Sequence, residues 1–333
     1  MIGFCLAAGA GTRLAPVTRT TPKALLAPAG RPLVDLALEA LDRAGAAAVV
    51  VNAHHGAAQL GAHLAGRPGC GVLVEPVLAG TGGGLAAARH AGLLDADLAL
   101  VTCADVVVDP EDLAALAGLA ERTGAAAVVG LVPARRDPWP LRLERGRVTP
   151  DPAGTWASAG VYALRPALLD AVPPVRSDLT EVLLGPLARS GEALGLPLDH
   201  AWADAGTLRR FLDLSARLLA GCWPYRLPPG RLLAGDGRGG PVLLVEGASL
   251  DPRATAVGPL VLDAGSAAGP GALLTRAVVG AGARVGAGAR VTGSLLAAGA
   301  RLEPGETAAA ALVPAAVPVA SPGTGAGSSP ARA

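Results

Sequence analysis

The first two thirds of the chain alternate short apolar runs with amphipathic segments of helical period. The apolar runs have the length of buried strands, and we expect strands at residues 2–7, 47–52, 72–75, 98–103 and 126–132. The segments between them predict helices at 33–44, 57–64, 83–92 and 110–122, and a later helix at about 178–190. Strands that alternate with helices form a mostly parallel sheet covered on both faces. In such a sheet, ligands bind beyond the carboxyl ends of the strands.

A different pattern follows Tyr225. Apolar residues recur at intervals of six, with small residues between them, at Val261, Ala267, Leu273, Val279, Val285 and Val291. A second series with the same interval comes before it in another register, at Leu244, Leu250, Ala256 and Leu262. A fixed short period is typical of solenoids, in which each turn buries its apolar residue against the next. The alternative is a plain Gly/Ala linker, because several repeats are degenerate.

These patterns divide the chain into three parts. We expect an α/β domain over residues 1–225 and a repeat domain over 226–307. Residues 308–333 are rich in Ala, Pro, Ser and Gly without a period, which predicts a disordered tail.

Charge and composition bear on partners and location. The net charge is +1 and no basic run is present, which argues against nucleic acid and anionic membranes as partners. No long apolar stretch is free of charges, Pro or several Gly, and the N-terminus has no basic segment typical of a signal peptide. The four cysteines show no Cys-x-x-Cys spacing. We therefore expect a cytoplasmic protein.

Residues 6–26, LAAGAGTRLAPVTRTTPKALL, carry the strongest functional signal. An expected strand runs into the small residues Ala8, Gly9, Ala10, Gly11 and Thr12, which allow backbone N–H groups to approach a phosphate closely. Two cations of different shape follow at Arg13 and Lys23. Lys23 is the only lysine among 28 basic residues, although chance alone could also have left it there.

Two other phosphate-binding motifs do not fit this segment. A dinucleotide-binding fingerprint would need a third glycine where the chain has Leu14, and Gly-Lys-Ser/Thr occurs nowhere. The segment instead resembles the signature of the sugar-1-phosphate nucleotidyltransferase family. This resemblance implies an α/β fold with a Rossmann-like, mostly parallel sheet, followed by a short left-handed parallel β-helix of hexapeptide repeats.

The resemblance assigns roles to particular residues. It implies that Ala8 to Thr12 embrace the nucleotide, that Arg13 contacts the triphosphate and that Lys23 grips phosphate at the reacting centre. Three later segments follow in the family's order. Glu75, Gly80 and Thr81 resemble the base-reading loop, Gly160 lies where the family binds its sugar, and Asp105 and Asp204 resemble the two metal-binding aspartates.

The implied reaction joins a sugar 1-phosphate to a nucleoside triphosphate (NTP) and releases pyrophosphate. The expected cofactor is magnesium (Mg²⁺), a hard cation that takes one or two carboxylates and completes its shell with phosphate oxygens and water. Attack would be in line, without a protein nucleophile.

The substrates are harder to predict. The layout resembles mannose-1-phosphate guanylyltransferases, whereas the Thr81–Gly84 run and residues 139–164 are closer to N-acetylmuramate 1-phosphate uridylyltransferases. The acceptor-only carboxylate of Glu75 would suit guanine, unless it caps a loop instead.

One departure from the family is the lack of a lysine in the stretch 147–151 that precedes the sugar site, where Arg142, Arg145 or Arg147 could substitute. Cys103 is a second departure, beside the first aspartate. Two other functions stay open: a hexapeptide-repeat acyltransferase, although no histidine lies in the repeat, and a non-catalytic sugar-nucleotide-binding regulatory subunit. In either case, the exposed end of the β-helix predicts a homo-oligomer.

Overall fold

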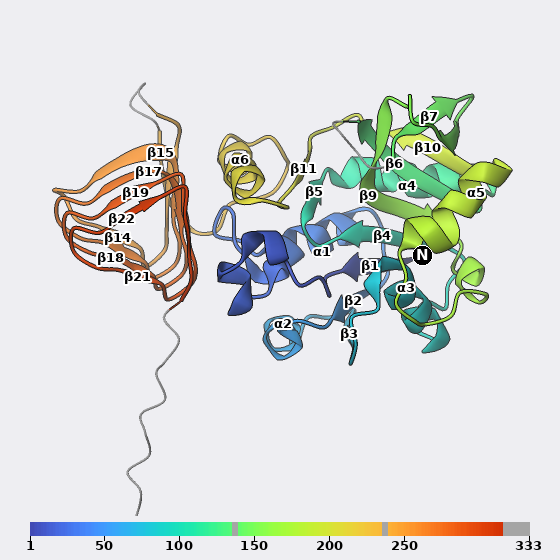
Figure 1. Cartoon of the computed structure of the whole chain (residues 1–333), viewed down its shortest axis with the longest axis horizontal. Coiled ribbons are helices and arrows are strands. Elements are labelled where there is room, and N and C mark those ends of the chain that lie inside the picture. The colour runs from blue at the N-terminus through green and yellow to red at the C-terminus, as the bar shows by residue number, and fades with distance from the viewer. Residues whose placement is uncertain (135–138, 235–238, 316–333) are drawn as a thin grey trace, which may run out of the picture.

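The computed structural model of the chain describes residues 1–134, 139–234 and 239–315. Its N-terminal part is built on a nine-stranded sheet with the strand order β3-β2-β1-β4-β9-β6-β10-β8-β7 (Figure 1). The strands are β1 (Ile2–Leu6), β2 (Val49–Ala53), β3 (Cys70–Val74), β4 (Ala99–Cys103), β6 (Ala127–Pro133), β7 (Leu141–Glu144), β8 (Arg147–Pro150), β9 (Trp156–Leu164) and β10 (Ala193–Pro197). All but β8 and β9 run in one direction, which confirms the mostly parallel sheet.

Helices cover both faces of this sheet. One face packs against α1 (Leu33–Arg43), α2 (Ala57–Leu64) and α4 (Pro110–Thr123). The other face packs against α3 (Gly80–His90), a π-helical turn (Thr180–Leu184) and α5 (Gly185–Ser190). Alternate residues of each strand enter the two layers, so Phe4 packs with α3 whereas Cys5 packs with α1. Among the described residues, no helix is long and apolar enough to cross a bilayer.

Two short strands continue the domain towards its second half. β5 (Val106–Val108) follows β4 and pairs antiparallel with β11 (Trp202–Asp204). The chain then enters α6 (Leu208–Leu219), whose first turn is capped by the hydroxyl of Thr207, which accepts a hydrogen bond from the Arg210 N–H at 3.3 Å.

The C-terminal part is a stack of parallel strands that follows β12 (Gly230–Leu233). One ladder contains β13 (Val242–Val245), β15 (Thr255–Leu262), β17 (Leu273–Val279), β19 (Arg290–Thr292) and β22 (Thr307–Ala309), with β20 (Leu295–Leu296) and β23 (Leu312–Val313) at its side. A second ladder contains β14 (Ser249–Leu250), β16 (Ala267–Ala268), β18 (Arg284–Val285) and β21 (Arg301–Leu302). We call residues 242–313 the repeat domain.

The strand register shows that the two series of apolar residues at intervals of six form one continuous series. Leu244 pairs with Leu262 and Leu262 pairs with Val279, so the second series continues directly into the later residues. The interval of six shortens to five between Leu274 and Val279, and again between Val291 and Leu296. Ala267 and Leu273 were therefore assigned one position too early. The residues in the stack are their neighbours Ala268 and Leu274, which are buried.

The repeat domain also extends further than expected. β22 and β23 pair with β19 and β20, because Val291 aligns with Ala308 and Leu296 with Val313. A disordered tail that starts at residue 308 is therefore wrong for residues 308–313. Residues 316–333 of that tail lie outside the described residues.

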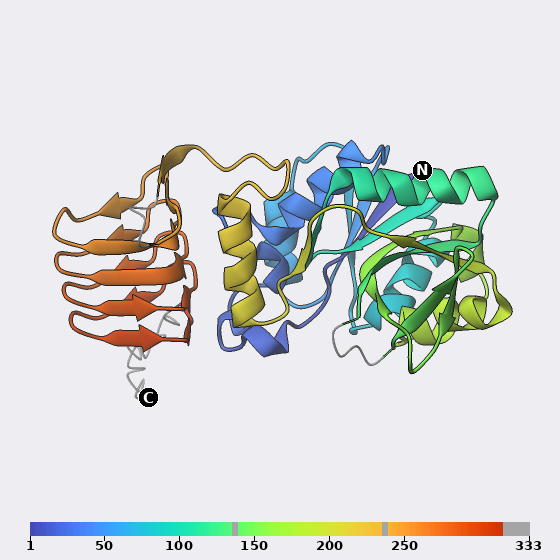
Figure 2. The same ribbon diagram turned by 90° about the horizontal axis from the view of Figure 1, so that it is seen from above.

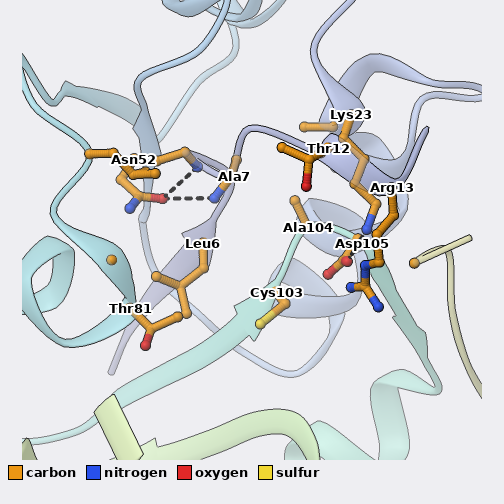
Figure 3. Close-up of a pocket in the computed structure, with 17 residues that line it drawn as sticks. Leu6, Ala7, Thr12, Arg13, Lys23, Asn52, Thr81, Cys103, Ala104 and Asp105 are labelled. Atoms are coloured by element: carbon orange, nitrogen blue, oxygen red, sulfur yellow. Dashed lines mark hydrogen bonds and ion pairs between the residues drawn. The ribbon is translucent and has the colours of Figure 1, made fainter. Parts of the chain in front are cut away.

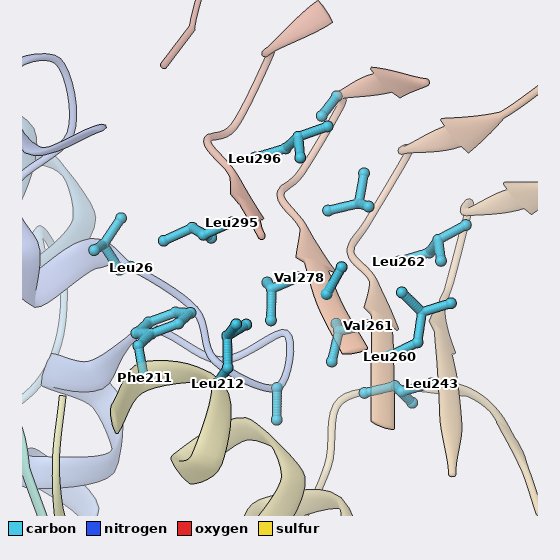
Figure 4. Close-up of a cluster of buried hydrophobic side chains, with 14 of the residues drawn as sticks. Leu26, Phe211, Leu212, Leu243, Leu260, Val261, Leu262, Val278, Leu295 and Leu296 are labelled. Atoms are coloured by element: carbon cyan, nitrogen blue, oxygen red, sulfur yellow. The ribbon is translucent and has the colours of Figure 1, made fainter. Parts of the chain in front are cut away.

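α6 joins the two parts. Figure 2 shows the helix between the repeat strands and the N-terminal segments that follow β1. Phe211 and Leu212 of α6 belong to one buried cluster with Leu26, and with Val261 and Val278 of the repeat domain (Figure 4). The repeat domain therefore shares a continuous core with the N-terminal part. Burying an apolar side chain stabilises a fold by about 1.5–3 kcal/mol, so this shared core stabilises both parts.

A charge inside the stack should unfold the repeat domain. Val291 is fully buried, so Val291→Asp would bury an unpaired carboxylate and lower the free energy of unfolding by about 3 kcal/mol or more. Thr292→Asp, on the exposed side of the same strand, is the matched control and should cost less than about 0.5 kcal/mol. Chemical denaturation followed by circular dichroism measures both. Equal stabilities would contradict the assigned register.

Candidate active site

The loop after β1 contains two glycines, Gly9 and Gly11, that have different roles. Gly11 has a left-handed φ of +63°, and a methyl group there would lie 3.0 Å from both Lys23 Cβ and Thr18 Cγ2. The Thr18 hydroxyl donates to the Gly11 carbonyl at 2.9 Å and holds this turn. A methyl group on Gly9 would meet nothing within 4 Å. Gly11 is therefore required by the fold, whereas Gly9 faces open space that a ligand can enter.

A cavity of about 330 Å³, which we call the loop cavity, opens at the carboxyl ends of β1 and β4 (Figure 3). Many of the residues predicted to act on the nucleotide and phosphates line it: Ala8, Gly9, Gly11, Thr12, Arg13, Lys23, Gly80, Thr81 and Asp105. Ala10, Glu75, Gly160 and Asp204 do not line it. Asn52, Cys103 and Gly206 line it as well, and no site role was predicted for them.

Glu75 is buried beside the loop cavity and accepts hydrogen bonds that fix the neighbouring segments. The carboxylate is 4% exposed; Oε1 accepts from Asn52 Nδ2 at 2.7 Å, and Oε2 accepts from the Ala79 N–H at 3.0 Å. Asn52 Oδ1 in turn accepts from the N–H groups of Ala7 at 2.7 Å and Ala8 at 3.3 Å. The expected contact between Glu75 and a base edge does not fit this arrangement. The alternative, a carboxylate that holds a loop, does.

Gly84 allows this network to form. A methyl group on Gly84 would lie 2.6 Å from Glu75 Oε1 and 2.7 Å from Asn52 Nδ2. Gly80 and Gly83 are equally confined, because added methyl groups would lie 2.5 Å from the Ser177 carbonyl oxygen and 2.1 Å from that of Val175. The glycines at the start of α3 are therefore required for close packing. The Thr81 hydroxyl is also engaged, since it accepts from the Leu179 N–H at 2.8 Å.

Lys23 and Asp105 both line the loop cavity and form an ion pair there. Lys23 Nζ donates to Asp105 Oδ2, and the lysine side chain is only 12% exposed. Asp105 follows β4, and its backbone carbonyl accepts from the Ala205 N–H at 2.8 Å. This bond fixes the end of β11 beside the end of β4.

Asp204 lies next to this pair but faces the other side of Gly206. Its Oδ1 accepts from the Gly206 N–H at 2.9 Å, and Arg210 Nη1 lies 3.0 Å from both carboxylate oxygens. A methyl group on Gly206 would lie 2.6 Å from Asp204 Oδ1 and 3.2 Å from Arg13 Nη2. Gly206 therefore lies between Asp204 and Arg13, where a larger side chain would not fit.

The two aspartates suit a magnesium ion. Asp204 is the last residue of β11 and is in register with Val106 of β5, and Asp105 lies in the turn directly before Val106. Each carboxylate now forms an ion pair with a cationic side chain, which a metal ion would have to replace. Within the described residues, no cluster of three or more His, Cys, Asp or Glu could hold a metal. Magnesium does not need such a cluster, because substrate phosphates and water complete its shell.

Cys103 lines the loop cavity as a thiol. Burial, together with the nearby Asp105 carboxylate, raises the pKa of Cys103 to about 12. Its sulfur therefore stays protonated at neutral pH and is a poor nucleophile.

The arginines predicted to replace the missing lysine lie elsewhere. Arg142 donates to Asp151 and Glu144 on the β7–β8 hairpin. Arg145 and Arg147 line a depression beside β10. None of the three lines the loop cavity.

Gly160 lines a separate cavity of about 220 Å³ between β9, the β7–β8 hairpin and α5, which we call the hairpin cavity. Gly160 has a φ of +74°, and a methyl group there would lie 3.4 Å from Cys103 Sγ, which lines the loop cavity. The two cavities therefore adjoin at Gly160.

Comparisons with known proteins identify the family of this chain. The model of the MobA-like NTP transferase domain matches residues 3–172. A mannose-1-phosphate guanylyltransferase from Mycobacterium tuberculosis is 31% identical over 293 residues, which cover 82% of this chain and 78% of the relative. An N-acetylmuramate alpha-1-phosphate uridylyltransferase from Neisseria meningitidis is 33% identical over 237 residues, covering 67% of this chain and 100% of the relative.

A solved structure shares the fold. A crystal structure from Bacillus anthracis, assigned as a glucose-1-phosphate thymidylyltransferase, superposes with a TM-score of 0.58 at 19% identity. The superposition covers 66% of this chain and 94% of the other. The fold is that of a nucleotidyltransferase. The chain belongs to the MobA-like NTP transferase family, and the membership predicted from residues 6–26 is confirmed.

Glu75→Gln separates the two interpretations of this residue. A glutamine offers one acceptor oxygen where two donors now bind, so it should lower the free energy of unfolding by about 1–2 kcal/mol. If Glu75 only holds the loop, rates with GTP and UTP should fall by the same factor. A nucleotide panel and thermal unfolding measure both effects. A change of fivefold or more in the GTP to UTP preference would restore Glu75 as a base-contacting residue.

Thiol alkylation should separate the cysteines. Cys222 is exposed, whereas the raised pKa of Cys103 leaves very little thiolate at pH 8. Iodoacetamide should therefore modify Cys103 at least about a thousandfold more slowly than Cys222. Peptide mass spectrometry over a time course measures the two rates. Comparable rates would show that Cys103 is ionised.

Proposed function

We propose that this protein transfers a nucleotidyl group from an NTP to a sugar 1-phosphate, giving a nucleoside diphosphate sugar and pyrophosphate. The observation that carries the proposal is the loop cavity, in which a glycine loop, Arg13 and the chain's only lysine converge on Asp105. Both relatives described above have names that specify nucleotidyl transfer to a sugar 1-phosphate.

GTP and mannose 1-phosphate are the substrates we favour. The match to the mannose-1-phosphate guanylyltransferase covers 82% of the chain, which is more than residues 1–225 can supply, so it includes part of the repeat domain. The uridylyltransferase match covers 67%. The alternative is a uridylyltransferase that acts on N-acetylmuramate 1-phosphate or glucose 1-phosphate.

The proposed chemistry follows from the charges. A phosphate oxygen of the sugar 1-phosphate attacks the α-phosphorus in line, and the bond to the bridging oxygen breaks so that pyrophosphate leaves with the electron pair. The backbone N–H groups of the loop and Arg13 bind the leaving phosphates, and Lys23 binds the phosphate at the reacting centre. Lys23 must then leave Asp105, its present partner.

Asp105 and Asp204 would hold Mg²⁺. When bound there, the ion would offset the negative charge that gathers on the α-phosphate. The sugar phosphate is already an anion at neutral pH, so no general base is required.

A pyrophosphate-release assay tests the function. GTP, UTP, ATP, CTP and dTTP would be crossed with the 1-phosphates of mannose, glucose, N-acetylglucosamine and N-acetylmuramate in the presence of Mg²⁺. We expect the highest rate with GTP and mannose 1-phosphate. Lys23→Ala should reduce this rate about 100-fold or more, a loss of about 2.7 kcal/mol in transition-state binding.

Arg19→Ala is the matched control, because it removes an exposed positive charge from the same segment outside the cavity lining. It should leave the rate within about twofold. Nucleotide binding without turnover for any pair would contradict the enzyme and favour a regulatory subunit. A UTP rate tenfold above the GTP rate would contradict the choice of nucleotide.

We also propose that the repeat domain is a left-handed parallel β-helix. Its aligned residues fall into three columns that continue through successive turns, led by Leu244, Leu250 and Ala256. Partners lie 17 or 18 residues apart, close to three hexapeptides per turn, as in the pairs Leu262–Val279 and Leu244–Leu262. A crystal structure that shows a right-handed coil would overturn this proposal.

A further inference from the structure

The acceptor substrate needs a cation that the loop cavity does not offer. A sugar 1-phosphate brings a second phosphate next to the triphosphate, and both are anionic. Arg13 and Lys23 are the basic side chains that line the loop cavity among the described residues. The proposed function assigns Arg13 to the leaving phosphates and Lys23 to the phosphate at the reacting centre, so a further cation for the phosphate of the sugar would come from another side.

A third cavity lies on that side. It has a volume of about 450 Å³ and lies between β9, β11 and α6, so we call it the α6 cavity. Asp204 lines it, and this residue contacts Gly206 of the loop cavity. Ser158 lines both the α6 cavity and the hairpin cavity, where Gly160 lies. The α6 cavity therefore adjoins the loop cavity at Asp204 and Gly206, and the hairpin cavity at Ser158.

Two arginines line the α6 cavity in the described part of the chain, and one of them has other duties. Arg217 donates to the Trp202 carbonyl at 2.9 Å, and its guanidinium stacks 4.5 Å above the centre of the Trp223 ring. Arg210 is 53% exposed, and its ion pair in the described residues is with Asp204. Arg210 is thus the cation of this cavity that can change partner.

The other titratable groups near Arg210 have ion-pair partners of their own. Asp213, one turn further along α6, forms ion pairs with Arg276 of the repeat domain and with Arg209. His200 interacts with Glu111 and Asp112 of α4. Asp204 therefore faces Arg210 without a second ion-pair partner in the described residues.

We propose that Arg210 binds the phosphate of the sugar 1-phosphate, and that it exchanges Asp204 for this phosphate when the substrates assemble. In the present ion pair one nitrogen of Arg210, Nη1, lies 3.0 Å from both oxygens of Asp204, and a phosphate offers this guanidinium anionic oxygens of the same kind. The exchange also frees Asp204 from its ion pair for the Mg²⁺ that the proposed function assigns to it, while Oδ1 keeps its hydrogen bond from the Gly206 N–H. The ion pair thus keeps two binding groups occupied until both ligands are present. This inference rests on the proposed function for the identity of the phosphate ligand.

Arg210→Ala tests the exchange, with Arg209→Ala as the matched control. Arg209 is the preceding residue on α6, and its side chain is 90% exposed. Arg210→Ala should raise the KM for mannose 1-phosphate at least about 10-fold and leave the KM for GTP within threefold. Arg210→Lys should recover part of this loss, because it keeps the positive charge but replaces the planar guanidinium with a compact ammonium. Arg209→Ala should match the wild type.

Metal affinity gives a readout that does not depend on turnover. Because Asp204 is no longer paired, Arg210→Ala should bind Mn²⁺ at least about threefold more tightly than wild type in the absence of substrates, measured by electron paramagnetic resonance. Calorimetry with mannose 1-phosphate, in the presence of Mn²⁺, should show weaker binding by the same variant. An unchanged KM for mannose 1-phosphate, or unchanged Mn²⁺ affinity, would overturn the exchange.

Failure of the proposed function is distinguishable from failure of this inference. If wild-type protein releases no pyrophosphate with any pair of substrates, the function is wrong, and the two binding measurements still test Arg210. If wild type is active and Arg210→Ala behaves like Arg209→Ala, only the role of Arg210 is wrong. Should Arg210→Ala fail to fold in a thermal unfolding control, the same comparisons apply to Arg210→Gln, which removes the positive charge but keeps a polar side chain of intermediate length.

Discussion

The geometry of the loop cavity depends on one buried carboxylate. Glu75 can only accept hydrogen bonds, so it fixes the amide of Asn52 with its nitrogen towards Glu75 and its oxygen towards the backbone N–H groups of Ala7 and Ala8. The same carboxylate holds the Ala79 N–H at the start of α3. Three segments that are distant in sequence are thereby fixed around one point. A buried donor or acceptor that loses its partner costs about 1–3 kcal/mol. Breaking one hydrogen bond of this series would therefore destabilise the groups that make the others.

The second organising feature is the compensation of charge. The two aspartates proposed to bind metal are each neutralised by a cation, Lys23 for Asp105 and Arg210 for Asp204. An unpaired carboxylate at a partly buried site is unfavourable, and so is an unpaired cation. The free protein therefore satisfies its own charges. Phosphates and a metal ion would redistribute the same partners rather than add charge to an empty site.

The sequence predicted the local features and missed those that depend on distant contacts. Residues 6–26 identified the glycine loop, Arg13 and Lys23, and the strand pattern located β1, β2 and β4 to within about two residues. Asn52 was missed because its partners lie 23 and 45 residues away. The shortened steps of the repeat were missed because strict spacing of six hides a five-residue interval, which only the alignment of Leu274 with Val291 reveals.

The position of α6 has a consequence for how this protein can be divided. Phe211, Leu218 and Trp223 lie in one buried cluster with Val261 and Val278 of the repeat domain. The sequence pattern changes after Tyr225, which suggests a domain boundary at which the chain could be truncated. A fragment that ends there would expose the apolar face of the helix that follows Asp204, and such a surface promotes association between molecules. The repeat domain thus covers an apolar face of the N-terminal domain and forms one core with it.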